Sequence, residues 1–363
     1  MKLLFLADAN SVHSWRWIEF FADRGHEIHW VSLVPFPRSA PRGIRTYEVG
    51  RYPRGPVSLG RAVSITHRVG RDVRPDVFHV HSVGTYGVVG AMAGIRPLLA
   101  TAWGSDVLIA TQQRVKRALV SWVLRRADLI TCDAHHMRDA IVDLGADPSK
   151  IRVIFFGTDV TRFRPRDNGT QPPAFFPRDG KVLILSTRNL HPIYDVGTLI
   201  RAIPHIIEHV PGARFVIVGE GEEREALIGL SRNLGLDASV VFAGAIAADE
   251  MPLALAAADI YVSTSLSDAG LAASTAEAMA CGLPVVVTDS GENRIWVEDG
   301  GGYVIPVRNS TALAEAILRL ASDAELRSRF GGHNRKVIEE RNNYHLEMRR
   351  VEETYQQLAA IHS

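Results

Sequence analysis

Residues 263–284 read STSLSDAGLAASTAEAMACGLP. They lie between two short apolar runs, Ile260–Ser263 and Pro284–Thr288, which predict buried strands. The polar turn between the runs contains Gly270, and the small residues Ser274–Ala280 predict a helix. Strand, turn, helix and strand in this order form one βαβ unit, which is the building block of a parallel sheet with helices on both faces.

The same alternation extends in both directions along the chain. Further strands are expected at Leu3–Leu6, Glu27–Leu33, Thr46–Val49, Val77–His81, Pro97–Ala100, Leu129–Cys132, Ile151–Phe155, Val182–Leu185, Ala213–Val218, Val240–Ala243 and Tyr303–Val307. Further helices are expected at Trp15–Arg24, Gly60–Arg74, Val83–Ala93, Arg114–Arg126, His135–Leu144, Val196–His209, Glu222–Leu234, Ala248–Ala257, Ser310–Ala321 and Asp323–Phe330, with a long one from Leu346 to the end. The fold class is therefore α/β, with doubly wound parallel sheets.

The alternation is interrupted once, over Arg164–Gly180, where Pro, Gly, Asn, Asp and Gln accumulate. We therefore expect a first domain at residues 1–165, a linker at 166–180 and a second domain at 181–340. The C-terminal helix, 341–363, is expected to pack back toward the first domain. Ligands of such sheets bind at the carboxyl ends of the strands, which places the expected site in the cleft between the domains.

The composition excludes several classes of protein. A chain of 363 residues with 46% apolar and 22% charged residues is neither disordered nor a coiled coil. Two distant cysteines, Cys132 and Cys281, argue against a disulfide framework and a structural zinc site. The apolar run at the start ends at Asp8, so it predicts a strand and not a signal peptide, and no run is long enough to span a membrane. We expect a cytoplasmic protein.

Charge is divided unequally along the chain, although the formal net charge is only +1. Residues 1–170 carry 24 basic and 15 acidic side chains, a net charge of +9. Residues 171–363 therefore carry a net charge of −8. Two halves of opposite sign indicate that each half meets a different partner.

The predicted helix at Ser274–Ala280 brings free N–H groups and the positive end of its dipole to the end of a strand, which favours an anion. Small residues there let a phosphate approach the backbone. Glu277, one to two turns into the helix, is placed to bind ribose hydroxyls behind a diphosphate. Alternatively, it is a solvated glutamate on a packed helix.

The residues Glu277–Val286, EAMACGLPVV, resemble the end of the paired-glutamate motif of the family 4 glycosyltransferases. Other segments agree with the family in the same order: Gly157–Asp159 with Phe163–Pro165, Thr187–Leu190, Val218–Gly221 and Phe242–Gly244. The resemblance covers nearly the whole chain and is most specific across Arg188–Pro306. It implies the GT-B fold, in which two doubly wound Rossmann-like domains face each other across a cleft.

The resemblance implies that the second domain binds a nucleotide diphosphate sugar. Arg188, at a strand end, is expected to offer a free guanidinium to the donor phosphates, or else to form a surface ion pair. Together with the helix N-terminus it would stabilise the leaving diphosphate, so that neither a metal nor another cofactor is required. The donor-binding residues expected are Arg188, Asn189, Tyr194, Gly244, Asp268, Gly270, Leu271, Ala272, Ser274 and Glu277.

Two departures from the family pattern affect the sugar end of this site. The position of the first motif glutamate is Ala269, and its neighbour Asp268 is the expected substitute. The usual lysine shortly after the arginine is replaced by the sequence Ile193-Tyr194-Asp195, so Tyr194 offers a hydrogen bond but no charge. The expected catalytic residues are Arg188, Asp268 and His81.

The first domain is expected to bind the acceptor. Its candidates are Asn10, Ser11, His13, Arg16, Trp103 and Asp106, which follow predicted strands. His13 is expected to bind a substrate hydroxyl or to be a capping or solvated histidine, and Asp106 to bind acceptor hydroxyls or cap the next helix. Trp103 is expected to stack on a sugar ring. His79 and His81 lie on one predicted strand, and we expect them to face opposite sides of the sheet, with His81 at the cleft.

Basic residues of the first half gather on two predicted helices, one with Arg61, Arg68, Arg71 and Arg74, the other at Arg114–Arg126. A basic amphipathic helix lies readily on an anionic bilayer, although the same pattern also fits a solvated outer face. No RNA-reading motif accompanies the charges, so nucleic acid is not an expected partner.

The function expected from these features is a retaining glycosyltransferase. It would move a sugar from a nucleotide diphosphate sugar to a glycan or lipid-linked acceptor, in cell-surface polysaccharide or glycolipid biosynthesis, at the inner face of the membrane. The resemblance implies front-face displacement, in which the leaving phosphate helps to deprotonate the acceptor. The alternatives are a nucleotide-sugar epimerase of the same fold and a non-enzymatic two-domain sugar-binding protein. A dinucleotide dehydrogenase is disfavoured because Asp8-Ala9-Asn10-Ser11 stands where a G-x-G-x-x-G motif would follow the first strand.

Overall fold

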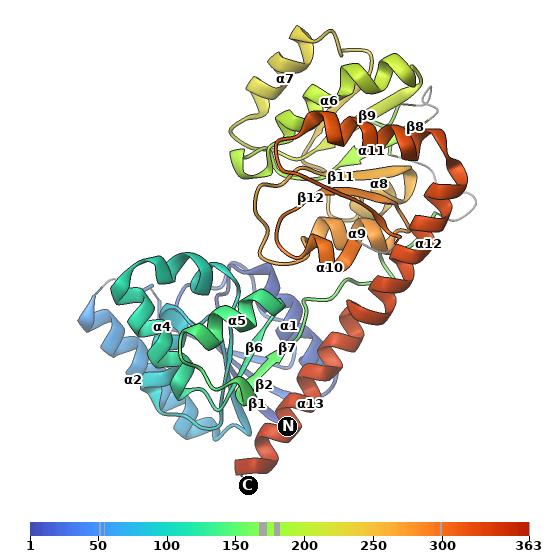
Figure 1. The fold of residues 1–363 in the computed structure, drawn as a ribbon. Coiled ribbons are helices and arrows are strands. Elements are labelled where there is room, and N and C mark those ends of the chain that lie inside the picture. Colours follow the sequence, from blue (N-terminus) through green and yellow to red (C-terminus); the bar gives the residue numbers. More distant parts are fainter. Residues whose placement is uncertain (51, 54, 167–172, 178–181, 298–299, 363) are drawn as a thin grey trace. The chain divides into compact units, whose positions relative to one another are not determined.

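A computed structural model describes residues 1–50, 52–53, 55–166, 173–177, 182–297 and 300–362. The chain forms two compact units, coloured from blue to red along the sequence in Figure 1. The first unit consists of Met1–Phe156 and Leu346–Ser363, and the second of Gly157–His345. Most of the expected linker, at 167–172 and 178–180, lies outside the described residues.

The two units part after Phe156, earlier in the chain than the expected boundary at residue 165. Thr158 explains the difference, because it pairs with the chain on both sides of Asn343: its N–H donates to Asn342 O at 2.7 Å, and its carbonyl accepts from Tyr344 N at 3.0 Å. Arg335 adds two further bonds, since its guanidinium donates to the carbonyls of Phe163 and Val160. Residues 157–165 are thereby tied to the second unit.

The first unit contains a seven-stranded sheet in the order β3-β2-β1-β4-β5-β6-β7, in which all neighbouring strands are parallel. Its strands are β1 (Lys2–Leu6), β2 (Glu27–Ser32), β3 (Ile44–Glu48), β4 (Val77–His81), β5 (Leu98–Thr101), β6 (Leu129–Cys132) and β7 (Ile151–Val153). Its helices are α1 (Val12–Asp23), α2 (Pro56–Val73), α3 (Thr85–Ala93), α4 (Arg114–Arg126), α5 (His135–Asp143) and α13 (Tyr344–His362), the last from Leu346 onward. Short helical turns are η1 (Ser105–Ile109), η2 (Ala110–Gln112) and η3 (Pro148–Lys150).

The second unit contains a six-stranded parallel sheet in the order β10-β9-β8-β11-β12-β13. Its strands are β8 (Val182–Ser186), β9 (Ala213–Val218), β10 (Val240–Gly244), β11 (Ile260–Ser263), β12 (Val285–Thr288) and β13 (Gly302–Ile305). Its helices are η4 (Pro192–Tyr194), α6 (Val196–His209), α7 (Arg224–Asn233), α8 (Met251–Ala257), α9 (Ala273–Ala280), α10 (Asn293–Val297), α11 (Ser310–Ser322) and α12 (Ala324–Arg341).

The cores follow from the apolar strands. Residues 3–6 of β1, all of β4 and all of β11 are buried, as expected for parallel strands covered on both faces. The α/β prediction with two doubly wound sheets is confirmed. In each sheet the strand order reverses once: the chain starts in the middle, winds to one edge and returns to the other side. The reversals lie between β1 and β4 and between β8 and β11, and ligands of such sheets bind at these switch points.

Helix α12 is longer than expected, since we ended it at Phe330, before Gly331 and Gly332. Gly331 does not end the helix but lets α12 pack closely against the chain just after α9. A Cβ at this position would lie 1.9 Å from the carbonyl oxygen of Gly282. The π-helical turn η1 and the short helix α10 were not anticipated.

Candidate functional site

The switch point of the second unit is lined by the segments that follow β8 and β11. Arg188 comes two residues after β8, and Ser265 and Asp268 lie shortly after β11. Because β8 and β11 are neighbours in the sheet, their ends bring these side chains together. The sequence prediction that Arg188, Asp268 and the start of α9 share one site is consistent with this geometry.

Arg188 is 8% exposed, and its guanidinium is held from several sides. Nη2 lies 2.6 Å from Oδ1 of Asp268 and 3.4 Å from Oγ of Ser265, while Nη1 donates to Oγ of Ser274 at 3.2 Å. The guanidinium carbon also stacks 4.2 Å from the centroid of the Tyr194 ring. The expectation that the guanidinium is free is therefore wrong. In the described structure the carboxylate of Asp268 neutralises it.

Two glycines let the loops after β8 and β9 pack directly on each other. A Cβ at Gly219 would lie 2.6 Å from the carbonyl oxygen of Arg188, and one at Gly221 would lie 2.2 Å from that of Leu190. The backbone is bonded across the same contact, with Leu190 N donating to Glu220 O at 2.9 Å. The backbone of Arg188 is thus fixed by loop packing, which limits where its guanidinium can lie.

Helix α9 begins beside this arginine. Its N-cap residue, Ala272, offers no side-chain hydrogen bond, so the first turn keeps backbone N–H groups for another acceptor. Ser274 points its hydroxyl toward Arg188, and Glu277 lies three residues further on, on the same helix face, and is half-buried. A cation, an uncapped helix start and a carboxylate are thereby gathered around one edge of the second sheet.

The remaining donor candidates surround this group or lie near it. Asn189 is exposed beside Arg188, Leu271 and Ala272 are half-buried at the start of α9, and Gly270 is buried. Gly244 ends β10 with a φ of 71°, and a Cβ there would lie 2.9 Å from Oε1 of Glu220. Asp268, the expected substitute for the missing glutamate, also receives a long bond from Oγ of Ser290, at 3.5 Å.

In the first unit, rings cluster beyond the ends of β4 and β5. Trp103 stacks on Phe156 at 4.8 Å and on His13 at 5.6 Å, and His13 lies 4.6 Å from Phe156. The edge of Trp17 meets Trp103 at 5.7 Å. Phe156 and Trp17 were missed as site residues, because neither stands in a motif. Trp103, which we expect to stack on a sugar ring, is therefore one of several rings in contact. Of these, His13 is exposed, and Trp103 and Phe156 are half-buried.

His79 and His81 face the same side of the sheet, contrary to our expectation. Residues two apart on a strand share a face, and their rings lie 4.4 Å apart. His79 is a core histidine: Nδ1 contacts the Tyr355 hydroxyl at 2.7 Å and Nε2 contacts Thr101 Oγ1 at 2.6 Å.

His81 differs from His79 in its hydrogen bonding. It is 3% exposed, contacts Trp17 and Trp103, and has no hydrogen-bond partner at either ring nitrogen among the described residues. Burial lowers its pKa to about 3, so the imidazole is neutral near pH 7. A neutral buried imidazole is suited to hydrogen bonding with a ligand hydroxyl, and less suited to carrying a proton as a charged imidazolium.

The polar candidates of the first unit largely organise loops. Ser11 caps α1 by accepting from Ser14 N, and Asn10 N donates to Asp8 Oδ1 at 2.8 Å. Both carboxylate oxygens of Asp106 are engaged, by Val83 N at 2.8 Å and Trp103 N at 2.9 Å, which joins the segments after β4 and β5. Burial raises the pKa of Asp106. Because Asp106 lies inside η1 and accepts from Val83 N and Trp103 N, these bonds join two loops and do not support the alternative that it caps the next helix.

Partial burial of the His13 ring, followed by the positive charge of the half-buried Arg16, lowers the pKa of the His13 imidazole. The direction of the shift is the same as for His81.

Among the described residues, one group could ligate a metal: His205, Glu208 and His209, whose ligand atoms lie within 4.8 Å of one another. All three are exposed at the end of α6. Since α6 has 14 residues, this group lies about 20 Å along the helix from the Tyr194 turn. It takes no part in the arrangement around Arg188.

Comparisons with known proteins agree with this geometry. Residues 167–337 match the model of the glycosyl transferases group 1, and residues 2–134 match that of the glycosyl transferase 4-like proteins. The chain belongs to the family 4 glycosyltransferases. It is 24% identical over 335 residues to N-acetyl-alpha-D-glucosaminyl L-malate synthase of Bacillus anthracis, covering 88% of this chain and 86% of that one.

A second relative matches over a shorter length. A GDP-mannose-dependent alpha-(1-6)-phosphatidylinositol monomannoside mannosyltransferase of Mycobacterium tuberculosis is 30% identical over 162 residues, which are 43% of this chain and 42% of the relative.

Solved structures confirm the GT-B fold. Sucrose-phosphate synthase from Thermosynechococcus elongatus superimposes with a TM-score of 0.83 at 19% identity, over 99% of this chain and 100% of that one. The Anabaena protein HepE in complex with UDP gives 0.79 at 20% identity, again over 99% and 100%. In the described part of the chain, no helix has the length and hydropathy needed to cross a bilayer.

Proposed function

We propose that this glycosyltransferase takes a sugar from a nucleotide diphosphate donor bound at the β8–β11 switch point. The observation that carries the proposal is the convergence of Arg188, the uncapped start of α9 and Glu277 at that edge. Arg188 and the helix N–H groups would bind the diphosphate, and Glu277 the ribose hydroxyls. The UDP complexes of HepE, which has the same fold, support a nucleotide ligand.

Charge at this site supports departure of the diphosphate without a metal. As the bond to the sugar breaks, negative charge grows on the β-phosphate, and the preorganised guanidinium and helix dipole stabilise it. Asp268 is bonded to Arg188 before the donor arrives, so the diphosphate has to take its place. Asp268 is then freed to contact the sugar, in the position where the family motif has a glutamate one residue later.

We propose transfer with retention of configuration, by front-face displacement. No carboxylate is singled out as a covalent nucleophile, and the leaving phosphate oxygen is the base that takes the proton of the acceptor hydroxyl. The anomeric configuration of the product, determined by NMR, tests this part. An axial donor sugar that gives an axial product supports retention, whereas an inverted product contradicts it.

The acceptor would be a glycan or a lipid-linked sugar bound by the first unit. The rings of His13, Trp103 and Phe156 offer stacking faces, and His81 offers a buried nitrogen that lacks a partner within the described residues. Relatives whose names include phosphatidylinositol mannoside transfer support a lipid-linked acceptor. Such a product belongs to glycolipid or cell-surface polysaccharide synthesis.

We also propose that the first unit lies on an anionic membrane surface. By sequence count the first unit carries a net charge of +7 and the second −6. Each lysine or arginine close to an anionic bilayer contributes about 1 kcal/mol of attraction. Peripheral association of this kind would bring the enzyme to a lipid-linked acceptor at the inner face of the membrane.

A further inference from the structure

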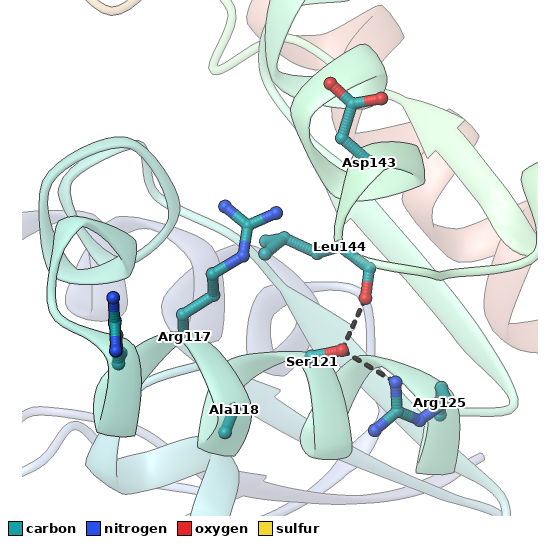
Figure 2. A pocket seen from close by; sticks show the side chains of 7 residues that line it. Arg117, Ala118, Ser121, Arg125, Asp143 and Leu144 are labelled. Carbon is teal, nitrogen blue, oxygen red and sulfur yellow. Dashed lines mark hydrogen bonds between the residues drawn. The ribbon is translucent and has the colours of Figure 1, made fainter.

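Helix α4 and the end of α5 line a cavity of about 460 Å³ on the first unit, which is open to solvent (Figure 2). Its lining is Arg114, Arg117, Ala118, Ser121, Arg125, Asp143 and Leu144. Three guanidinium groups face one carboxylate, so the lining carries a net positive charge of two. Neither the ring cluster nor the Arg188 group includes any of these residues.

Hydrogen bonds fix one wall of the cavity. The Ser121 hydroxyl donates to the carbonyl of Leu144, at the end of α5, and Arg125 Nη1 donates to Ser121 Oγ at 2.7 Å (Figure 2). These bonds tie α4 to the end of α5 at one side of the cavity.

Two of the three cations at the cavity are uncommitted. Arg114 and Arg117 are exposed, and neither guanidinium group has a hydrogen bond or an ion pair within the described part of the chain. In contrast, Arg24, Arg38 and Arg96 of the same unit are each paired with a carboxylate. A pair of free guanidinium groups beside a cavity suits an anion with several oxygens, such as a phosphate.

The neighbouring stripe of α4 is apolar and aromatic. Val115 is 73% exposed and Leu119 43% exposed, and Trp122 and Arg126 follow on the same face, with the Arg126 guanidinium 4.9 Å from the Trp122 ring centroid. Exposed aliphatic side chains, a tryptophan and several cations on one helix are typical of an element that lies at the boundary of headgroups and acyl chains. Helix α4 contains five basic residues and no acidic residue.

We propose that the α4–α5 cavity binds the phosphate of an anionic phospholipid headgroup, while Val115 and Leu119 enter the boundary between headgroups and acyl chains of the leaflet that the protein faces. The proposal rests on the membrane orientation proposed above and names the element that makes the contact. A bilayer accounts for both the free guanidinium groups at the cavity and the apolar stripe of α4. A free phosphate compound would occupy the cavity but leave the apolar stripe in water.

Co-sedimentation with vesicles of phosphatidylcholine containing phosphatidylglycerol tests the proposal. The double variant Arg114→Gln with Arg117→Gln is expected to bind about 30-fold more weakly than the unmodified protein, since each basic residue contributes about fivefold. The matched control is Arg61→Gln with Arg68→Gln, which removes two exposed charges from α2. Vesicles with the same charge supplied by oleate should bind more weakly than those with phosphatidylglycerol. Circular dichroism and melting temperature verify that both variants fold.

The outcomes separate the two proposals. If the unmodified protein does not bind phosphatidylglycerol vesicles, the membrane orientation fails and the cavity proposal fails with it. If it binds, but the α4 variant binds as well as the α2 control or oleate serves equally, the orientation stands and the headgroup cavity is refuted. If Val115→Ser with Leu119→Ser leaves vesicle binding unchanged, the insertion of the apolar stripe is refuted. If, in addition, millimolar glycerol phosphate binds the unmodified protein, the cavity is a site for a free phosphate compound.

Discussion

Arg188 Nη2 lies 2.6 Å from Oδ1 of Asp268, and the two side chains are only 10% and 8% exposed. The pair lies where a donor diphosphate would be stabilised. The carboxylate of Asp268 is therefore bonded to the same guanidinium of Arg188 that the diphosphate would need. Breaking a buried pair by removing one partner leaves an uncompensated charge, which is strongly destabilising. In the proposed function, donor binding would therefore exchange one partner of Arg188 for another.

Asp268→Asn separates these two partners. The variant is expected to lose about 3 kcal/mol of stability without ligand, because the Arg188 charge is left buried without its counter-ion. A nucleoside diphosphate should restore that charge balance, so saturating UDP or GDP should raise its melting temperature more than that of the unmodified protein. The matched control is Asp289→Asn, which breaks an exposed ion pair with Arg294 and should cost less than about 1 kcal/mol. Equal ligand-induced shifts in both Asp268 forms would argue against the exchange.

Glu277→Ala tests the proposed ribose contact. The carboxylate is half-buried on α9 and is not part of the packed strand layer, so the fold should survive its removal. Loss of charged hydrogen bonds to ribose should weaken nucleoside diphosphate binding by about 10- to 100-fold, as measured by calorimetry. Glu315→Ala, on the exposed side of α11, provides the control. Unchanged affinity with an intact fold would remove Glu277 from the donor site.

Glu347 should make stability depend on pH. Burial raises the pKa of its carboxyl from the ordinary 4.5 to about 7, although Arg350 and the Phe155 N–H favour the charged form. The folded protein thus prefers the protonated group, and this contribution is complete below about pH 4.5 and is lost as the pH rises through 7.

The corresponding variant is Glu347→Gln. From pH 5 to pH 8 its stability should improve relative to the unmodified protein, by at most about 3 kcal/mol. Chemical denaturation at several pH values measures this. Parallel pH profiles for the two proteins would contradict the assignment.

Tyr355→Phe tests how α13 is attached to the first sheet. The hydroxyl bonds Nδ1 of His79 at 2.7 Å, and the other ring nitrogen bonds Thr101. Removing the hydroxyl leaves a buried nitrogen without a partner, which should cost about 1–3 kcal/mol of unfolding free energy. Tyr303→Phe, whose hydroxyl has no bond within the described residues, should change stability little. A Tyr355→Phe variant as stable as the control would show that packing alone holds the helix.

Local patterns in the sequence predicted most elements because short apolar runs alternate with helical periodicity across both units. The failures have physical causes that a local pattern does not contain. The glycines at 331 and 332 suggested a helix end, yet Gly331 is required by its contact with the Gly282 carbonyl 49 residues away. His79 and His81 share a face, as the two-residue period of a strand requires, so the prediction of opposite faces is wrong.

The site divides in the same way. The sequence singled out Arg188, Asp268 and Glu277 as candidates, because each follows a strand end or a helix start, and the structure bonds Arg188 to Asp268. The bond between Arg188 and Asp268 joins residues 80 apart, so the sequence did not reveal that the guanidinium is occupied. Phe156 and Trp17 were missed because aromatic residues outside motifs look like ordinary core.

The central claim is that Arg188 stabilises the leaving diphosphate of a nucleotide sugar. The most direct measurement is the rate of nucleoside diphosphate release from a panel of UDP-, GDP- and other nucleotide sugars, with glycan and lipid-linked acceptors, for the unmodified protein, Arg188→Ala and the exposed control Arg232→Ala. The account predicts turnover of a nucleotide sugar that falls about 100-fold or more in Arg188→Ala and stays normal in the control. Turnover of no nucleotide sugar, or a normal rate in folded Arg188→Ala, would contradict it.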